Sequence, residues 1–198
     1  MYLDTLSSSS SHATFDGSGG GSGNLASGWS SVSKPPADRP LIVPYGPLPL
    51  PPSSTILNYG QGLFEGLKAF RRPSGEIVIF RPDANAARCR KGCARMLMPP
   101  VRDGAFVEAV EAVAAENARF VPPTGDGALY LRPLVFGSGA KLGVAASDEF
   151  TFCVWASPVG NYFKTKGNES AGGGDLLAGV APISLLASRE YPRSCAGG

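Results

Sequence analysis

The chain has 198 residues, of which 43% are hydrophobic and 17% charged, and its formal net charge is +2. That charge is too small to indicate a general attraction to nucleic acid or to a membrane surface, and no apolar run approaches the ~18 residues of a transmembrane helix. The length allows one domain or one and a half, and 26 Gly with 18 Pro indicate a folded core with a large share of loop.

Residues 1–40 are rich in Ser and Gly, with dense runs at 7–11 and 17–23. Such a segment has little apolar surface to bury, so we expect it to be disordered. A plastid or mitochondrial transit peptide is the alternative, since Ser and Ala are plentiful. Against that alternative, no Arg precedes Arg39, and Asp4 and Asp16 are present.

The next elements are an extended stretch and a hairpin. Residues 40–52 are rich in Pro, which biases each preceding residue toward extended backbone. Strands at 67–72 and 76–81 then form a predicted β-hairpin. Its turn is Arg72-Pro73-Ser74-Gly75, where Pro and Gly suit turn positions.

Two helices follow the hairpin. The first is predicted to be capped by Asp83 and to run to about Leu97, where Met98-Pro99-Pro100 ends it. The second begins near Asp103 and closes at Val121-Pro122-Pro123. Its apolar face is expected to hold Phe106, Val110, Val113 and Asn117, with Glu108, Glu111 and Glu116 outside it.

Two strands, at 128–136 and 149–157, are predicted after the helices, joined by the loop 137–143. Both faces of the second strand are apolar, so we expect it to be covered on both sides. Residues 165–175 read as a flexible linker. Residues 180–187 read as the first strand of a further unit, whose unpaired edge leaves it mobile. The fold class is therefore α+β, with a domain at 41–164 followed by the linker and the start of an incomplete domain at 176–198.

The reactive side chains exclude some chemistry. The single histidine, His12, lies in the Ser/Gly-rich segment, so a folded histidine base is unsupported. Cys89 and Cys93 lie four residues apart on one face of the first helix. A metal site is one interpretation, but no His or further Cys lies near them, so buried reduced thiols are the favoured interpretation, and we expect no metal site.

Two glycine-rich loops fail the nucleotide-binding patterns. Gly60-x-Gly62 departs from G-x-G-x-x-G because position 65 is Glu65, and Gly137-x-Gly139 departs from it at Leu142. Tight turns explain these glycines.

Two arginines are candidates for binding anions. Arg88, one turn into the first helix, presents a guanidinium that suits a phosphate through two parallel N–H bonds. Arg132 sits inside an apolar strand, where a charge needs a partner. That partner is either a substrate carboxylate or a structural acidic residue.

The chain resembles branched-chain amino acid aminotransferases, pyridoxal-phosphate enzymes of fold type IV, and in particular their plant members. The similarity is strong over residues 42–165 and continues weakly to Arg193. It rests on these segments in family order: 59–70 (YGQGLFEGLKAF), Phe80-Arg81-Pro82 with Asn85 and Arg88, Met98-Pro99, 129–133 (LYLRP) and 157–164 (SPVGNYFK). D-amino acid aminotransferases and aminodeoxychorismate lyases are related alternatives, but Tyr59–Gly66 favours the branched-chain group.

The resemblance implies roles for single residues. Arg88 and Arg193 are assigned to pyridoxal 5′-phosphate, with Arg88 at the phosphate. The substrate pocket is assigned to Tyr59, Phe64, Tyr130, Arg132 and Tyr162, together with a loop through Leu142 and Val144 that reaches the neighbouring subunit. A homodimer, amino acid and 2-oxo acid substrates, and a plastid, mitochondrial or cytoplasmic location follow from the same resemblance.

The resemblance also places the Schiff-base lysine a few residues after Arg193, whereas the sequence stops at Gly198. No catalytic residue is therefore assigned. We expect the chain alone to be inactive in amino-group transfer between leucine, isoleucine or valine and 2-oxoglutarate, and to bind the cofactor poorly. The alternatives are a non-catalytic module that pairs with a full-length relative, and a fragment without function.

Overall fold

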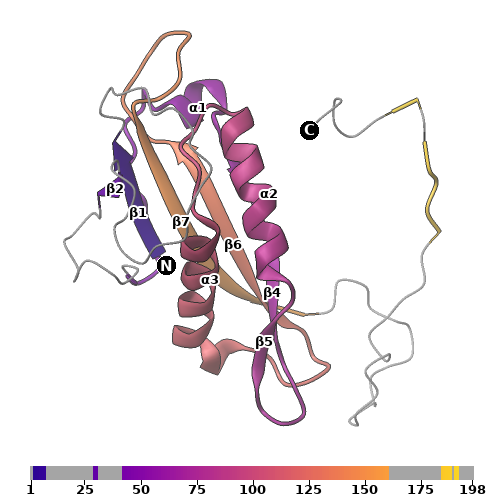
Figure 1. Cartoon of the computed structure of the whole chain (residues 1–198). Helices are drawn as coiled ribbons and strands as arrows, with labels where there is room; N and C mark the ends of the chain where they lie inside the picture. Colours follow the sequence, from indigo (N-terminus) through magenta and orange to yellow (C-terminus); the bar gives the residue numbers. More distant parts are fainter. Residues whose placement is uncertain (1, 8–28, 31–41, 161–183, 189, 192–198) are drawn as a thin grey trace, which may run out of the picture.

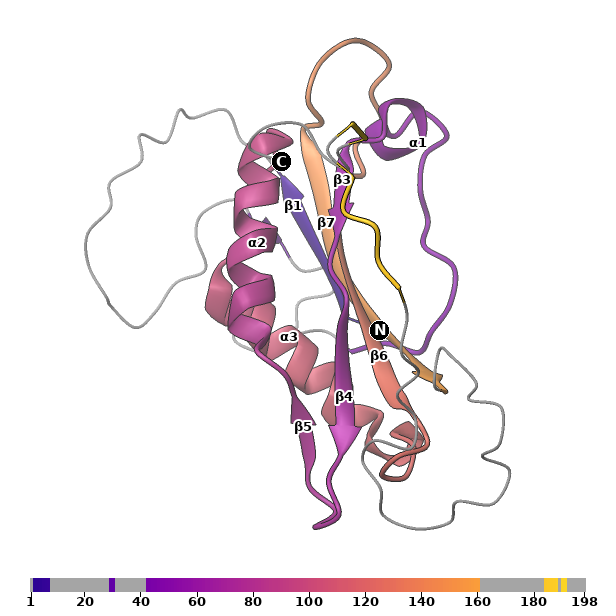
Figure 2. The ribbon, with the colours of Figure 1, turned by 90° about the vertical axis from the view of Figure 1, so that its right-hand side faces the viewer.

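A computed structural model describes residues 2–7, 29–30, 42–160, 184–188 and 190–191. It shows an antiparallel sheet in the order β2-β1-β7-β6-β4-β5, with β3 also paired to β6. Two helices cover one face of this sheet (Figure 1, Figure 2). The α+β prediction is thus confirmed. The elements are β1 (Tyr2–Ser7), β2 (Trp29–Ser30), α1 (Thr55–Tyr59), β3 (Gly62–Phe64), β4 (Leu67–Arg71), β5 (Ile77–Ile79), α2 (Pro82–Arg95), α3 (Asp103–Glu116), a 3₁₀ turn (Ala118–Phe120), β6 (Ala128–Gly137) and β7 (Glu149–Val159).

The predicted hairpin is confirmed as β4 and β5, which pair through Ala69↔Ile79 and Arg71↔Ile77. In its turn the Gly75 N–H donates to the Arg72 carbonyl at 2.8 Å. Gly75 has a φ of 87°, which explains why the turn needs a glycine there.

The start of α2 differs from the prediction. Asp83 is not the N-cap; Arg81 holds that position with φ 47° and ψ 55°, and Pro82 opens the helix. Pro suits the first helical position because its missing N–H would have no helical partner there. Asp83 therefore lies in the first turn, where its charge favours the positive end of the helix.

The end of α2 also comes earlier than predicted. The helix stops at Arg95, and Leu97 adopts the left-handed conformation with φ 54°. The Met98 N–H donates to the Cys93 carbonyl at 2.9 Å, and the Leu97 N–H donates to the Ala94 carbonyl at 3.3 Å. These two bonds form a Schellman motif with leucine where glycine is usual.

The core lies between the helices and one face of the sheet. Phe106, Val110 and Val113 of α3 are buried, as predicted, and the Phe106 ring stacks on Phe152 of β7 with centroids 6.0 Å apart. Strand β7 is covered on both faces between Phe150 and Val154, which confirms that prediction. Alternation along β6 turns Leu129 and Leu131 toward the helices and turns Tyr130, which lies between them, to the opposite face.

Four of the strands and α-helices were missed or misjudged, and β2 is one of them, because its residues were expected to be disordered. Residues 2–7, expected to be disordered, form β1, which pairs with β7 from Tyr2↔Val154 to Ser7↔Glu149. Without β1, the outer edge of β7 would present unpaired backbone groups. The short α1 and β3 were not predicted at all. The linker at 165–175 lies outside the described residues. So does half of the strand expected at 180–187, and residues 184–188 have no regular secondary structure.

Candidate functional site

The site forms where one edge of β6 changes partners. Strand β3 pairs with β6 up to Phe64↔Leu134, and β4 pairs with it from Leu67↔Leu131. Glu65 and Gly66 join the two strands. The Glu65 N–H still donates to the Pro133 carbonyl at 2.9 Å, so alternation turns the Glu65 side chain toward the helices.

The Glu65 carboxylate is only 4% exposed and holds two side chains of α2. It accepts hydrogen bonds from Nε of Arg88 at 2.8 Å, from Nη2 of Arg88 at 2.5 Å, and from Nδ2 of Asn85 at 2.8 Å. The hydrogen bond with Glu65, and then its charge, raise the pKa of the Arg88 guanidinium, against a smaller lowering by burial. The guanidinium side chain remains 70% exposed, so a buried carboxylate anchors an accessible cation.

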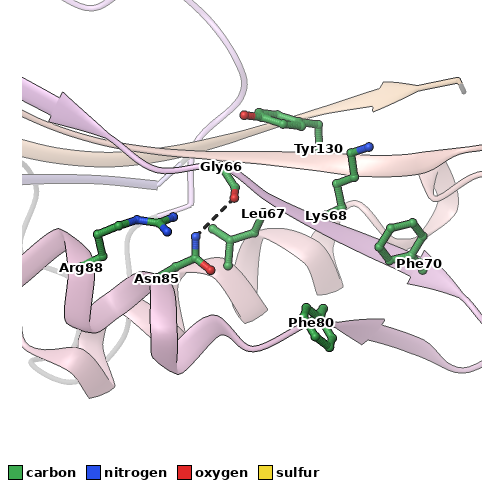
Figure 3. Close-up of a pocket in the computed structure, with 8 residues that line it drawn as sticks. All are labelled: Gly66, Leu67, Lys68, Phe70, Phe80, Asn85, Arg88 and Tyr130. Carbon is green, nitrogen blue, oxygen red and sulfur yellow. Dashed lines mark hydrogen bonds between the residues drawn. The ribbon is translucent and has the colours of Figure 1, made fainter. Parts of the chain in front are cut away.

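Arg88 lines a cavity of about 390 Å³ (Figure 3). Arg88 and Asn85 approach it from α2, and Nδ2 of Asn85 also donates to the Gly66 carbonyl at 3.3 Å. A side chain at Gly66 would overlap the Tyr130 hydroxyl, so a larger residue there would require the Tyr130 side chain to shift. The full lining is Gly66, Leu67, Lys68, Phe70, Phe80, Asn85, Arg88 and Tyr130.

Arg132 is held by aromatic rings on the sheet face opposite the helices. Its guanidinium carbon lies 4.3 Å from the Phe64 ring centroid and 5.2 Å from that of Tyr130. Its Nη2 donates to the Tyr130 hydroxyl at 3.0 Å. Within the described residues its buried Nε has no hydrogen-bond partner. The cation is therefore stabilised by ring faces.

Tyr59 lies against the loop that follows β6. Its hydroxyl accepts a hydrogen bond from the Gly143 N–H at 2.8 Å, between Leu142 and Val144, whose exposed fractions are 71% and 104%. Gln61 anchors the same loop, because its Oε1 accepts from the Ser147 N–H at 2.9 Å. The loop is therefore held by hydrogen bonds to Tyr59 and Gln61 and exposes two apolar side chains to solvent.

The structure brings together part of the residues expected at the site. Phe64, Tyr130 and Arg132 form one cluster, and Tyr130 links this cluster to the cavity of Arg88. Tyr59, Leu142 and Val144 form a second group around Gly143. Tyr162 and Arg193 lie outside the described residues.

Sequence reasoning missed Glu65, which it noted only as a departure from a nucleotide-binding pattern. It also missed the cavity wall made by Lys68, Phe70 and Phe80. The available signal was a carboxylate in an apolar stretch, together with Asn85 and Arg88 at helical spacing three apart.

Cys89 and Cys93 are buried free thiols, as predicted. The Cys89 thiol pairs with Cys93, which raises the pKa of Cys89 together with its burial and lowers the pKa of Cys93. Among the described residues, no group of three or more His, Cys, Asp or Glu side chains lies close enough to hold a metal ion. No helix in the same residues is long and apolar enough to cross a bilayer.

The fold and the site thus define an α+β domain with an anchored arginine at a cavity and a cluster of aromatic rings around a second arginine. No family model matches the sequence. Over 157 residues the chain is 48% identical to the chloroplastic branched-chain-amino-acid aminotransferase 5 of Arabidopsis thaliana, covering 79% of this chain and 35% of that protein. It is 46% identical over 154 residues to the mitochondrial branched-chain amino acid aminotransferase 1 of Humulus lupulus, covering 78% and 36%. A Mycobacterium tuberculosis branched-chain-amino-acid aminotransferase is 42% identical over 158 residues, covering 79% and 39%.

The chain is therefore a homologue of the branched-chain amino acid aminotransferases, and it spans about a third of the length of these relatives. Solved structures of such enzymes are also similar to it. The Thermoproteus uzoniensis enzyme with norvaline matches 59% of this chain and 37% of its own, with 22% identity and a TM-score of 0.49. The T.th. enzyme complexed with N-(5′-phosphopyridoxyl)-L-glutamate matches 54% and 35%, with 27% identity and a TM-score of 0.43.

Proposed function

We propose that this domain serves pyridoxal-phosphate-dependent amino-group transfer between branched-chain amino acids and 2-oxoglutarate. Its share is to hold the phosphate of the cofactor and to form the pocket for the apolar side chain. The observation that carries this proposal is Arg88, a cation fixed by Glu65 yet 70% exposed at a cavity. The sequence homology supplies the identity of the ligands.

The residues present fit a phosphate monoester. Glu65 takes two of the five N–H groups of Arg88, and within the described part of the chain the other three have no hydrogen-bond partner. Such donors bind phosphate oxygens through short, charge-assisted bonds. When bound, pyridoxal phosphate supplies an electron sink for bond breaking at the substrate α-carbon.

The aromatic cluster suits the substrate. Phe64 and Tyr130 offer rigid apolar surface for a branched side chain. Arg132, lying over both rings, offers a cation for a carboxylate of the amino acid or the 2-oxo acid. Tyr59, Leu142 and Val144 are proposed to complete the apolar wall. Tyr162 and Arg193 remain predictions from the resemblance.

The 198 residues by themselves are proposed to bind without catalysing transfer. The pyridine nitrogen of the cofactor needs a carboxylate partner to act as an electron sink. Both oxygens of Glu65 are already used by Arg88 and Asn85. The described cavity lining itself contains no acidic side chain.

Titration of the purified chain with pyridoxal 5′-phosphate, followed by the ¹⁵N–¹H NMR signals of its arginines, tests the proposal. We expect weak, saturable binding that shifts the Arg88 signal and is lost in Arg88→Gln. Arg90→Gln is the matched control, because Arg90 lies on the same helix in an exposed pair with Asp103. Binding unchanged in Arg88→Gln would refute the phosphate role. Glutamate formation from leucine and 2-oxoglutarate by the chain alone would refute its inactivity.

A second candidate function is pairing with another copy of this chain or with a full-length relative. The supporting observation is the anchored loop that exposes Leu142 and Val144. Sedimentation of the wild type and of Leu142→Asp tests it, with expected dimers in the first and monomers in the second. Monomers in both samples, with and without a full-length relative added, would refute pairing.

A further inference from the structure

Glu65 occupies an unusual position for a partner in an ion pair. Its carboxylate is 4% exposed, whereas the Arg88 side chain that it binds is 70% exposed. It also holds Asn85, and both of these α2 residues line the cavity. One buried anion therefore contacts both polar side chains that α2 contributes to the cavity.

Stability does not account for this arrangement. Burying a carboxylate carries a desolvation cost, and a partner that remains mostly in water returns little of it. For comparison, Arg90 of the same helix forms an ordinary ion pair with Asp103 of α3, in which both side chains are 46% exposed. That pair avoids the desolvation cost and contributes no residue to the cavity lining.

The geometry of the pair fixes a direction. A guanidinium is a rigid planar fork, and Glu65 engages the edge formed by Nε and Nη2 of Arg88. The N–H groups of Nη1 and the second N–H of Nη2 must then point away from Glu65. Since Arg88 lines the cavity, the fork is held with its remaining donors available there.

We propose that Glu65 is a positioning residue, which holds Arg88 and Asn85 in the orientation that receives a phosphate monoester. The identity of that ligand rests on the proposed function; the orientation of Arg88 does not. Charge alone makes the opposite prediction, because removing an anion beside a phosphate would strengthen binding. Weaker phosphate binding by Glu65→Gln therefore indicates positioning by Glu65, whereas tighter binding indicates that only the charge of Glu65 matters.

The test uses the full chain as wild type, Glu65→Gln, Arg88→Lys and the double variant. Asp103→Asn is the matched control, because it makes the same change of carboxylate to amide opposite an arginine of α2. The Arg88 Nε–H signal is first recorded by NMR without ligand, assigned through its loss in Arg88→Lys. Inorganic phosphate and pyridoxal 5′-phosphate are then titrated.

In the ligand-free wild type we expect a distinct, slowly exchanging Nε–H signal from Arg88 despite its exposure. Glu65→Gln should abolish that signal and weaken pyridoxal-phosphate binding about tenfold, as expected when a preorganised side chain becomes mobile. The same change should weaken binding much less in the Arg88→Lys background, where only Asn85 still depends on Glu65. Asp103→Asn should leave both the signal and the affinity unchanged.

A fast-exchanging, random-coil Nε–H signal in the wild type would overturn the proposal, and this measurement stands even if Glu65→Gln fails to fold. Equal or tighter binding by a folded Glu65→Gln variant would also overturn it. Failure of the proposed function looks different. In that case the Arg88 signal depends on Glu65 as expected, but pyridoxal 5′-phosphate does not shift it.

Discussion

Substitutions at Leu97 test whether the backbone is left-handed just after the end of α2. It holds a left-handed conformation with φ 54° and is 75% exposed, so its side chain contributes little packing. We compare Leu97→Gly with Leu97→Ala. Both variants lose the same exposed side chain, but only glycine is free of the left-handed penalty. The Leu97→Gly variant should therefore be the more stable of the two.

The expected magnitude follows from two opposing terms. A residue with a Cβ costs about 1–2 kcal/mol in the left-handed region. The glycine variant loses roughly 0.5–1 kcal/mol of stability relative to alanine, because glycine gives up more conformational entropy on folding. The net difference is about 0.5–1 kcal/mol in favour of glycine. With a urea m-value of about 2 kcal/mol/M, the two unfolding midpoints should differ by roughly 0.4 M.

Urea unfolding followed by circular dichroism measures this difference. Ala94, three residues earlier and inside the helix, is the control position. Ala94→Gly should destabilise the protein by about 1 kcal/mol, because there the helical φ is negative and only the entropy cost applies. The preference between Gly and Ala should thus reverse within one helical turn. If the protein with glycine is less stable than the protein with alanine at both positions, the left-handed conformation of Leu97 is refuted.

Two further predictions concern the buried thiol of Cys153 and the two glycines Gly66 and Gly137. Burial raises the pKa of Cys153 to about 12, while the unfolded thiol ionises near ~8.5. Because only the unfolded state then releases its proton, Cys153 should cost about 2 kcal/mol of stability between pH 8.5 and 10.5. Cys153→Ala should flatten the pH dependence of urea unfolding by that amount; parallel curves would contradict this. Gly66→Ala should cost about 1 kcal/mol through the Tyr130–Arg132 hydrogen bond. Gly137→Ala, which crowds buried Thr55 and Ser147, should cost about 3 kcal/mol. A larger loss of stability for Gly66→Ala than for Gly137→Ala in urea unfolding would contradict the close packing around Gly137.

The sequence predicted the elements whose pattern is set locally. The apolar face of α3 around Phe106, the turn at Gly75 and the apolar residues on both faces of β7 each carry their own signal, and each is confirmed. The five-residue α1 and three-residue β3 carry no such period. Isolated helices this short are unstable in water, so their structure depends on tertiary contacts such as that of β3 with β6.

The candidate site was predictable in part for the same reason. Arg132 stood out because a charge in an apolar strand needs a partner, and Arg88 because its guanidinium suits a phosphate. Spacing did not reveal Glu65 and Phe64, which contact these arginines from distant parts of the sequence. Glu65 lies 23 residues before Arg88, and only the packing of α2 beside the β3–β4 junction brings them together. The expected cap at Asp83 was wrong because Arg81 adopts a left-handed conformation that spacing does not reveal.

The length of the two-residue junction between β3 and β4 also determines which face of the sheet each side chain of β4 occupies. Because successive side chains of a strand point to opposite faces, the even length of Glu65–Gly66 keeps Leu67 and Ala69 in the core and Lys68 on the other face. One inserted or deleted residue would exchange these two sets. The length of this junction therefore couples the core to the cavity, whereas the exposed hairpin turn at Gly75 carries no such constraint.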